Sequence, residues 1–135
     1  MITLVAAAFL TLAQPQMGEL RDGVVHLNAQ EAAELIRNRE GLKILDVRTR
    51  PEFRSGHIAG AIQLNYFRID FKKQIADQEF PNGVLVHCQS GGRSARAVRI
   101  LKAQGVETIY HLDGGMVAWQ NAEFPVVMGD EEATE

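Results

Sequence analysis

Short hydrophobic runs alternate with amphipathic segments along most of the chain. The runs predict strands at Val24–Leu27, Lys43–Val47, Ala61–Leu64, Val84–His87 and Thr108–Leu112. The amphipathic segments predict helices at Ala29–Asn38, Pro51–Arg54, Tyr66–Gln78, Ser94–Gln104 and Met116–Asn121. Strands that alternate with helices favour an α/β fold with a largely parallel sheet.

Local signals mark several ends of these elements. Asn28 and Glu31 have the spacing of a capping box at the start of the first helix. Pro51 suits the first position of a short helix, and Gly105 lies where a C-terminal glycine cap belongs. Val24–Leu27 is short and β-branched, so we expect it at the edge of the sheet.

Composition narrows the class of protein. The 135 residues are 46% hydrophobic and 23% charged, which fits one globular domain with its own core. A single cysteine excludes an internal disulfide and a multi-cysteine metal site. The net charge of −3 is accounted for by the acidic tail at 129–135, so the remainder is close to neutral. No basic excess points to a nucleic-acid partner.

The N-terminus suggests export. Met1–Ala13 is apolar and has no charged side chain, but it is too short to span a membrane, so we expect no stable membrane insertion. It suits a secretory signal with cleavage after Ala13, although no Lys or Arg precedes it. A signal would place the protein in the periplasm or outside the cell. The alternatives are a cytoplasmic protein that starts near Met17, and an uncleaved apolar helix on the domain or a membrane. The expected division is therefore an N-terminal segment at 1–16, a domain at 22–128 and a disordered acidic tail at 129–135.

The candidate chemistry lies where the fourth predicted strand meets the next helix. Cys88 ends the strand, and a short loop with Gly91 and Gly92 follows it. Glycines let the chain curl so that backbone N–H groups approach a ligand, and a helix N-terminus adds unpaired donors and partial positive charge. Such a setting lowers the pKa of a thiol, so we expect Cys88 to be largely thiolate at neutral pH. Arg93 adds a positive charge, which Arg96 and Arg99 extend along the helix.

Each of these residues also has a structural interpretation. Cys88 could be a buried core cysteine. His87 points to the opposite face of the strand, so it belongs to the core or supports the site from behind. Ser90 and Ser94 could donate to a bound anion or cap the helix.

The loop length separates two chemistries. Phosphatases carry a Cys-x5-Arg loop around a tetrahedral phosphate, whereas Cys88 and Arg93 here form Cys-x4-Arg. The smaller ring suits a sulfur atom carried on the cysteine better than a phosphoryl group.

Three motifs give the chain a family resemblance from about Val24 to Val127. They are Leu45–Arg48 followed by Glu52-Phe53 and Gly56–Ala61, then Cys88–Ser94, and finally Leu112–Trp119. In this order they resemble a single-domain rhodanese, with Ala59 where proline is commoner. The resemblance implies a rhodanese-like α/β fold, with a five-stranded mainly parallel sheet and helices on both faces.

The resemblance also implies a sulfurtransferase that needs no cofactor and no metal. Cys88 would take a sulfur from a small anionic donor such as thiosulfate and pass it, as a persulfide, to a thiol or cyanide. The loop would bind the donor through Gln89, Ser90, Gly91, Gly92, Arg93 and Ser94.

The other signature residues have supporting interpretations. Asp46 would tie the loop together, and Arg48 would either face the anion or form a surface ion pair with Glu52. His57 and the Gly114-Gly115 turn would be structural, and Trp119 would pack the last helix on the core.

Three other functions remain open from the sequence. A persulfide carrier module with little thiosulfate turnover needs the same activated cysteine. A phosphatase or arsenate reductase is disfavoured by the short loop. A peroxide-sensing thiol is weakened by the lack of a second, resolving cysteine.

Overall fold

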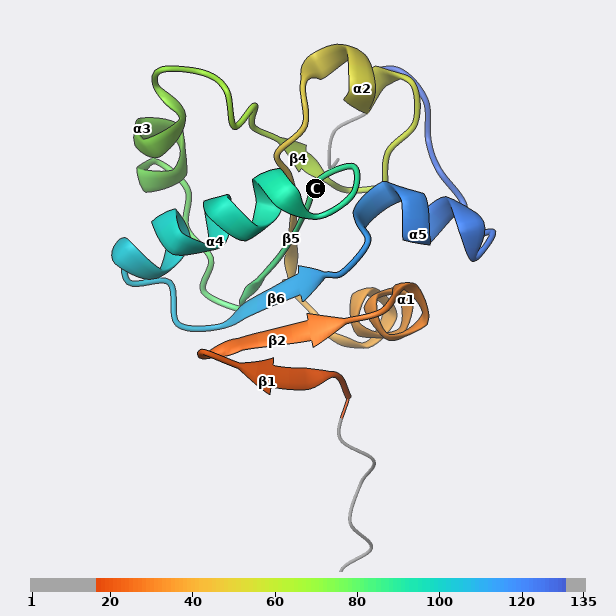
Figure 1. Cartoon of the computed structure of the whole chain (residues 1–135), viewed down its shortest axis with the longest axis horizontal. Coiled ribbons are helices and arrows are strands. Elements are labelled where there is room, and N and C mark those ends of the chain that lie inside the picture. Colours follow the sequence, from red (N-terminus) through yellow and green to blue (C-terminus); the bar gives the residue numbers. More distant parts are fainter. Residues whose placement is uncertain (1–16, 131–135) are drawn as a thin grey trace, which may run out of the picture.

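Six strands form one sheet in the computed structural model, which describes residues 17–130. Their order is β1-β2-β6-β5-β3-β4, and every neighbouring pair is parallel except β1 and β2 (Figure 1). The strands are β1 (Glu19–Arg21), β2 (Val24–Leu27), β3 (Lys43–Asp46), β4 (Ile62–Gln63), β5 (Val84–His87) and β6 (Ile109–Leu112). The predicted α/β fold is therefore confirmed.

Helices cover both faces of the sheet, as predicted. They are α1 (Ala29–Asn38), α2 (Arg50–Arg54), α3 (Phe71–Ala76), α4 (Gly92–Ala103) and α5 (Gly115–Asn121). α1, α2 and α5 share one buried cluster with Leu85 and Leu112, whereas α3 and α4 share another with Val84 and Val86. Successive residues of β5 therefore face opposite layers, which is the period of a strand buried on both sides.

The sheet has one strand more than the five predicted, and Val24–Leu27 does not lie at its edge. β1 pairs antiparallel with β2 and takes the edge position. Asp22 and Gly23 join them with positive φ angles of 51° and 77°, as in a tight two-residue hairpin turn. The Asp-Gly pair is the sequence signal for this hairpin, and Glu19–Arg21 is too polar and exposed to show as a hydrophobic run.

Two predicted helices differ from the structure. The helix expected at Tyr66–Gln78 is only α3, because the Asn65 side chain accepts the N–H of Phe67 (2.9 Å) and holds a turn in front of it. α4 begins at Gly92 with Gly91 as its cap, so Ser94 lies inside the first turn and does not cap the helix. The capping box at Asn28 and Glu31 is confirmed by both of its hydrogen bonds (2.8 and 3.0 Å).

The proposed signal at Met1–Ala13 and most of the acidic tail lie outside the described residues. The first two tail residues contact α2: Gly129 N donates to Arg54 O, and Asp130 pairs with Arg50 (2.9 Å each). Within residues 17–130, no helix has the length and apolar character that crossing a bilayer requires.

A Gly-Gly turn brings α5 against the loop that follows β5, and both segments lie side by side in Figure 1. The backbone N–H groups of Met116 and Val117 donate to the carbonyl oxygens of Cys88 (3.0 Å) and Gln89 (3.1 Å). Gly115 makes this approach possible: a Cβ atom there would lie 2.4 Å from Cys88 O. The loop that carries Cys88 is thus held from behind by the first turn of α5.

We expect Gly115→Ala to destabilise the protein through this contact. Residue 115 has a φ of 54°, and a left-handed conformation costs a non-glycine residue about 1–2 kcal/mol. Displacing the loop backbone adds about 1–3 kcal/mol of overpacking. The measurement is the free energy of unfolding in urea.

Gly105→Ala is the matched control. Gly105 has a φ of 83°, but its Cβ would meet no atom within 4 Å, so this variant carries the backbone cost alone. Equal losses in the two variants would show that the approach of α5 to the loop is not tight.

Candidate active site

Cys88 lies directly after β5, on the α4 side of the sheet. Its side chain belongs to the buried cluster of Val84 and Val86, and the residue is only 1% exposed. The loop then curls back through Gly91, whose φ of 118° is strained for any residue with a Cβ. This curl directs the N–H of Gly91 at Cys88 Sγ (3.1 Å), and the Ser94 hydroxyl lies 3.3 Å from the same sulfur.

Hydrogen bonds outweigh burial at this sulfur. Burial alone would raise the pKa of Cys88, because a thiolate loses hydration. The Ser94 hydroxyl and the backbone N–H groups of Ser94, Gly91 and Ser90 favour the charged form, and the net result is a lowered pKa. The loop is thus built for a thiolate, and the interpretation of Cys88 as an inert core cysteine is disfavoured.

His87 lies behind the cysteine, as its strand position predicts. It is fully buried, with Nδ1 3.1 Å from Cys88 O and Nε2 3.7 Å from Asp46 Oδ2. Burial lowers the pKa of His87, and the Asp46 carboxylate opposes that effect only in part. A neutral imidazole in this place supports the strand end.

Arg48 links the end of β3 to the loop. Its Nη2 and Nε donate to the two carboxylate oxygens of Asp46 (2.7 and 2.9 Å), and its Nη1 donates to Gln89 Oε1 (3.2 Å). Nη2 also donates to Gly56 O (2.9 Å). The predicted alternative of a surface ion pair between Arg48 and Glu52 is therefore wrong, because Arg48 is buried and pairs with Asp46, two residues before it. A contact between Arg48 and a donor anion stays a prediction.

Arg93 is paired with Glu52 on the other side of the loop. Nη1 and Nη2 donate to the two carboxylate oxygens (2.7 and 2.9 Å), and the guanidinium carbon lies 5.5 Å from the centre of the Phe67 ring. The hydrogen bond from Arg93 lowers the pKa of Glu52 to about 2, and Thr49 contributes to this shift. The sequence reasoning missed this pair, which fixes the direction of the guanidinium and offsets its charge.

A second missed feature lies at the ends of β2 and β6. His26 and His111 occupy paired positions of the two strands, and both imidazole Nδ1 atoms contact Asp113 Oδ1 (2.8 and 2.7 Å). His111 Nε2 lies 2.8 Å from Ser94 Oγ, which connects this cluster to the cysteine. The signal in the sequence was a histidine on a buried strand followed by an acid two residues later, since parallel strands end at one edge of the sheet.

Within residues 17–130 these three side chains are the group whose spacing could hold a metal ion, with ligand atoms within 4.8 Å of one another. Their geometry favours proton sharing instead, because both histidines use the same carboxylate oxygen and Arg21 Nη2 lies 3.3 Å from the other. Burial alone would raise the pKa of Asp113. The hydrogen bonds from His26 and His111 lower it by more than burial raises it, so the net shift is downward.

The remaining predicted residues lie in the loop or in the core, and binding of a donor by the loop residues stays a prediction. Gln89 and the exposed Ser90 and Gly92 lie in the curled loop beside Cys88. His57 is buried, stacks on Phe53 (3.5 Å between ring centres) and bonds the Phe53 carbonyl through Nδ1 (2.9 Å), as its structural interpretation predicted. Trp119 packs in the core and donates to Pro125 O (2.9 Å).

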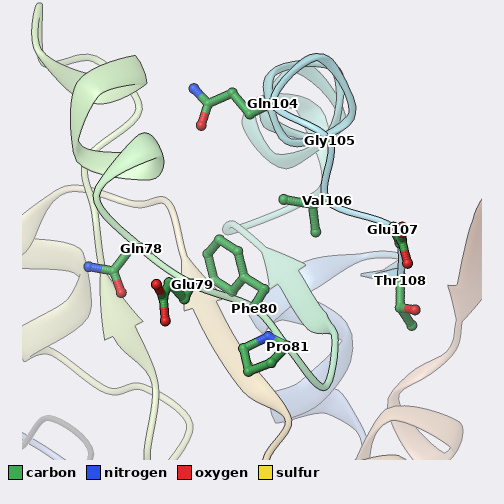
Figure 2. Close-up of a pocket in the computed structure, with 9 residues that line it drawn as sticks. All are labelled: Gln78, Glu79, Phe80, Pro81, Gln104, Gly105, Val106, Glu107 and Thr108. Atoms are coloured by element: carbon green, nitrogen blue, oxygen red, sulfur yellow. The ribbon is translucent and has the colours of Figure 1, made fainter.

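A cavity of about 400 Å³ lies at the opposite end of the sheet (Figure 2). It is formed by the segments that precede β5 and β6, and Phe80, Pro81 and Val106 make up its apolar part. It contains none of the candidate residues. The candidate loop around Cys88 lies instead at the carboxyl ends of the strands.

Comparison with known proteins agrees with this geometry. A family model described as a rhodanese-like domain matches residues 28–122. The chain is 33% identical to thiosulfate sulfurtransferase 18 of Arabidopsis thaliana over 81% of this chain and 88% of that protein. It is 31% identical to the thiosulfate sulfurtransferase GlpE of Pseudoalteromonas translucida over 72% of this chain and 90% of that protein.

A solved structure shares the fold. The crystal structure of a rhodanese-related protein from Thermoplasma volcanium matches with a TM-score of 0.66 and 29% identity, over 76% of this chain and 96% of that one. With the family model covering most of the chain and the motifs in place around Cys88, the protein belongs to the rhodanese-like domain family.

Proposed function

We propose that this protein is a sulfurtransferase that moves a sulfane sulfur from thiosulfate, or a related small anion, to a thiol or cyanide through a persulfide on Cys88. The observation that carries the proposal is the contact of Cys88 Sγ with Gly91 N–H (3.1 Å) and the Ser94 hydroxyl (3.3 Å). Relatives named thiosulfate sulfurtransferase support the choice of donor.

The first half-reaction loads the cysteine. The Cys88 thiolate attacks the outer sulfur of thiosulfate and forms a new S–S bond, while the bond to the sulfonate sulfur breaks and its electron pair leaves with sulfite. The product is a negatively charged persulfide. The donors that stabilise the thiolate also suit this charge, because they point to the same small volume.

The second half-reaction unloads it. Cyanide or a thiolate attacks the terminal sulfur of the persulfide, and the electron pair of the S–S bond returns to Cys88 Sγ. The products are thiocyanate or an acceptor persulfide, together with the original thiolate. The cycle starts and ends with the Cys88 thiolate and consumes no proton and no outside electron, so it needs no cofactor.

The proposal predicts that wild-type protein turns over thiosulfate and cyanide, and that Cys88→Ser abolishes turnover. A serine hydroxyl is not ionised at neutral pH and forms no persulfide, while its size leaves the loop intact. The measurements are steady-state thiocyanate formation and the intact mass of the protein after treatment with thiosulfate alone.

Three outcomes are distinguishable. Turnover together with a mass gain of one sulfur on Cys88 supports the enzyme. A mass gain without turnover would replace it by the carrier module, which needs the same cysteine. Absence of both from folded protein would overturn the proposal.

The Arg93–Glu52 pair gives a second prediction, on binding of the donor. We expect Arg93→Ala to raise the KM for thiosulfate about tenfold with a smaller change in kcat, because a charge-assisted hydrogen bond is worth about 1.5–3 kcal/mol. Part of that loss comes from Glu52, whose carboxylate is left unpaired near the site and repels an anion. The double variant Arg93→Ala/Glu52→Gln should therefore have a KM between those of wild type and Arg93→Ala.

Arg96→Ala is the control, since Arg96 is an exposed arginine on the same helix. Its KM should stay close to the wild-type value. If all the variants bind thiosulfate equally well, Arg93 does not contact the donor.

A further inference from the structure

A continuous chain of hydrogen bonds runs from the end of β6 to the cysteine. Asp113 Oδ1 contacts His111 Nδ1 (2.7 Å), His111 Nε2 contacts Ser94 Oγ (2.8 Å), and Ser94 Oγ lies 3.3 Å from Cys88 Sγ. We propose that this chain is a proton relay that removes the thiol proton of Cys88 when the thiolate forms. The inference rests on the sulfurtransferase function proposed above and deepens it, because it supplies the step that creates the nucleophile.

The chemistry of the groups sets the direction of the chain. An ionised carboxylate only accepts hydrogen bonds, so the proton between Asp113 and His111 belongs to Nδ1. In the neutral ring Nε2 is then the acceptor. It lies nearer to Ser94 Oγ (2.8 Å) than Gly91 O (3.1 Å) or Cys88 Sγ (3.3 Å) does, so the relay assigns the single hydroxyl proton of Ser94 to it. Ser94 Oγ is left as an acceptor for the S–H of Cys88. Every donor in the chain therefore faces an acceptor, and the order runs from sulfur to imidazole.

Ionisation then needs two short proton shifts. The proton of Cys88 Sγ passes to Ser94 Oγ while the hydroxyl proton of Ser94 passes to His111 Nε2. The S–H and O–H bonds break, new O–H and N–H bonds form, and no electron is transferred. The products are a thiolate that accepts the Ser94 hydroxyl and an imidazolium that donates to Ser94 and to Asp113.

Burial makes this path efficient. Ser94 is fully buried and His111 is 5% exposed, so bulk water does not compete for these bonds. The negative charge of Asp113 offsets the imidazolium, and its lowered pKa keeps it ionised for that role. The relay thus places a buried base two hydrogen bonds from a buried thiol.

Other charged and titratable groups surround His111 on every side. His26 of β2 shares Asp113, and its ring centre lies 5.3 Å from that of His111. Both imidazoles line a cavity of about 230 Å³ between β2 and α4, together with Arg21, Asp22, Arg99 and Lys102. Within the sheet, His87 of β5 is close enough for its charge to interact with that of His111. The cations among these residues oppose a positive charge on His111, so the relay would release the proton of the imidazolium to this cavity.

The test is the rate at which iodoacetamide alkylates Cys88 as a function of pH. This neutral reagent reports the thiolate without thiosulfate, and two coupled groups give two inflections in the profile. We expect two inflections in wild type. In His111→Leu a single inflection should remain, displaced to higher pH, with alkylation below neutral pH slower by about tenfold, the effect of one pKa unit.

His26→Leu is the matched control, because His26 bonds to the same oxygen of Asp113 but has no contact with Ser94 among its hydrogen bonds. It should keep the two-step profile. Asp113→Asn is the second relay variant, and it should fold even if His111→Leu does not, since the Asp113 side chain is 45% exposed. It should weaken the first step, because an amide can present a donor to Nδ1 and reverse the tautomer.

A wild-type profile in both His111→Leu and Asp113→Asn would overturn the relay. So would an equal displacement in His26→Leu, which would indicate general electrostatics. Either result would leave sulfur transfer intact if thiosulfate turnover persists. Conversely, a relay signature in protein that never forms a persulfide would refute the proposed function alone.

Discussion

A sulfur buried to 1% exposure can be ionised only if hydrogen-bond donors replace the water it has lost. The Ser94 hydroxyl and the backbone N–H groups of Ser90, Gly91 and Ser94 meet this requirement at Cys88. The backbone supplies N–H groups because the loop curls through a left-handed glycine, and the helix that follows leaves its first N–H groups unpaired. The fold therefore offers the stabilisation as fixed geometry, and no side-chain rotamer has to be ordered for most of it.

Fixed geometry needs anchors, and the loop is held from three directions. α5 binds the carbonyl oxygens of Cys88 and Gln89, Arg48 binds the Gln89 side chain, and His111 binds Ser94. These anchors come from the ends of β3 and β6, which flank β5 in the sheet. Parallel order brings all three strand ends to one edge. The site thus depends on the topology of the sheet as much as on its own motif.

The sequence predicted what is local. The capping box at Asn28, the glycine cap at Gly105 and the strand–loop–helix around Cys88 are determined by neighbours within a few residues, where pattern and propensity are informative. It missed β1 because an exposed polar edge strand has no hydrophobic run. The helix predicted around α3 was also too long at its start, where the Asn65 side chain accepts the N–H of Phe67 and holds a turn in place of the helix.

The errors in the site have a different origin. Glu52 and Arg93 lie 41 positions apart, and so do Arg48 and Gln89. Both contacts depend on how β3 and β5 lie side by side, and that register is not visible in either motif alone. The same holds for His26 and His111, whose shared contact with Asp113 follows from the pairing of β2 with β6. Residue types at strand ends therefore predict that charges meet, but they do not predict the partners.

Each of the two arginines at the loop has an acid beside it. Arg93 is paired with Glu52, and Arg48 with Asp46. The thiolate is therefore favoured by N–H and O–H groups at contact distance more than by free charge. Free charges act over about 10 Å and are screened by salt, whereas buried dipoles at about 3 Å are not. The stabilisation of a thiolate at this place therefore depends little on the ionic strength of the solution.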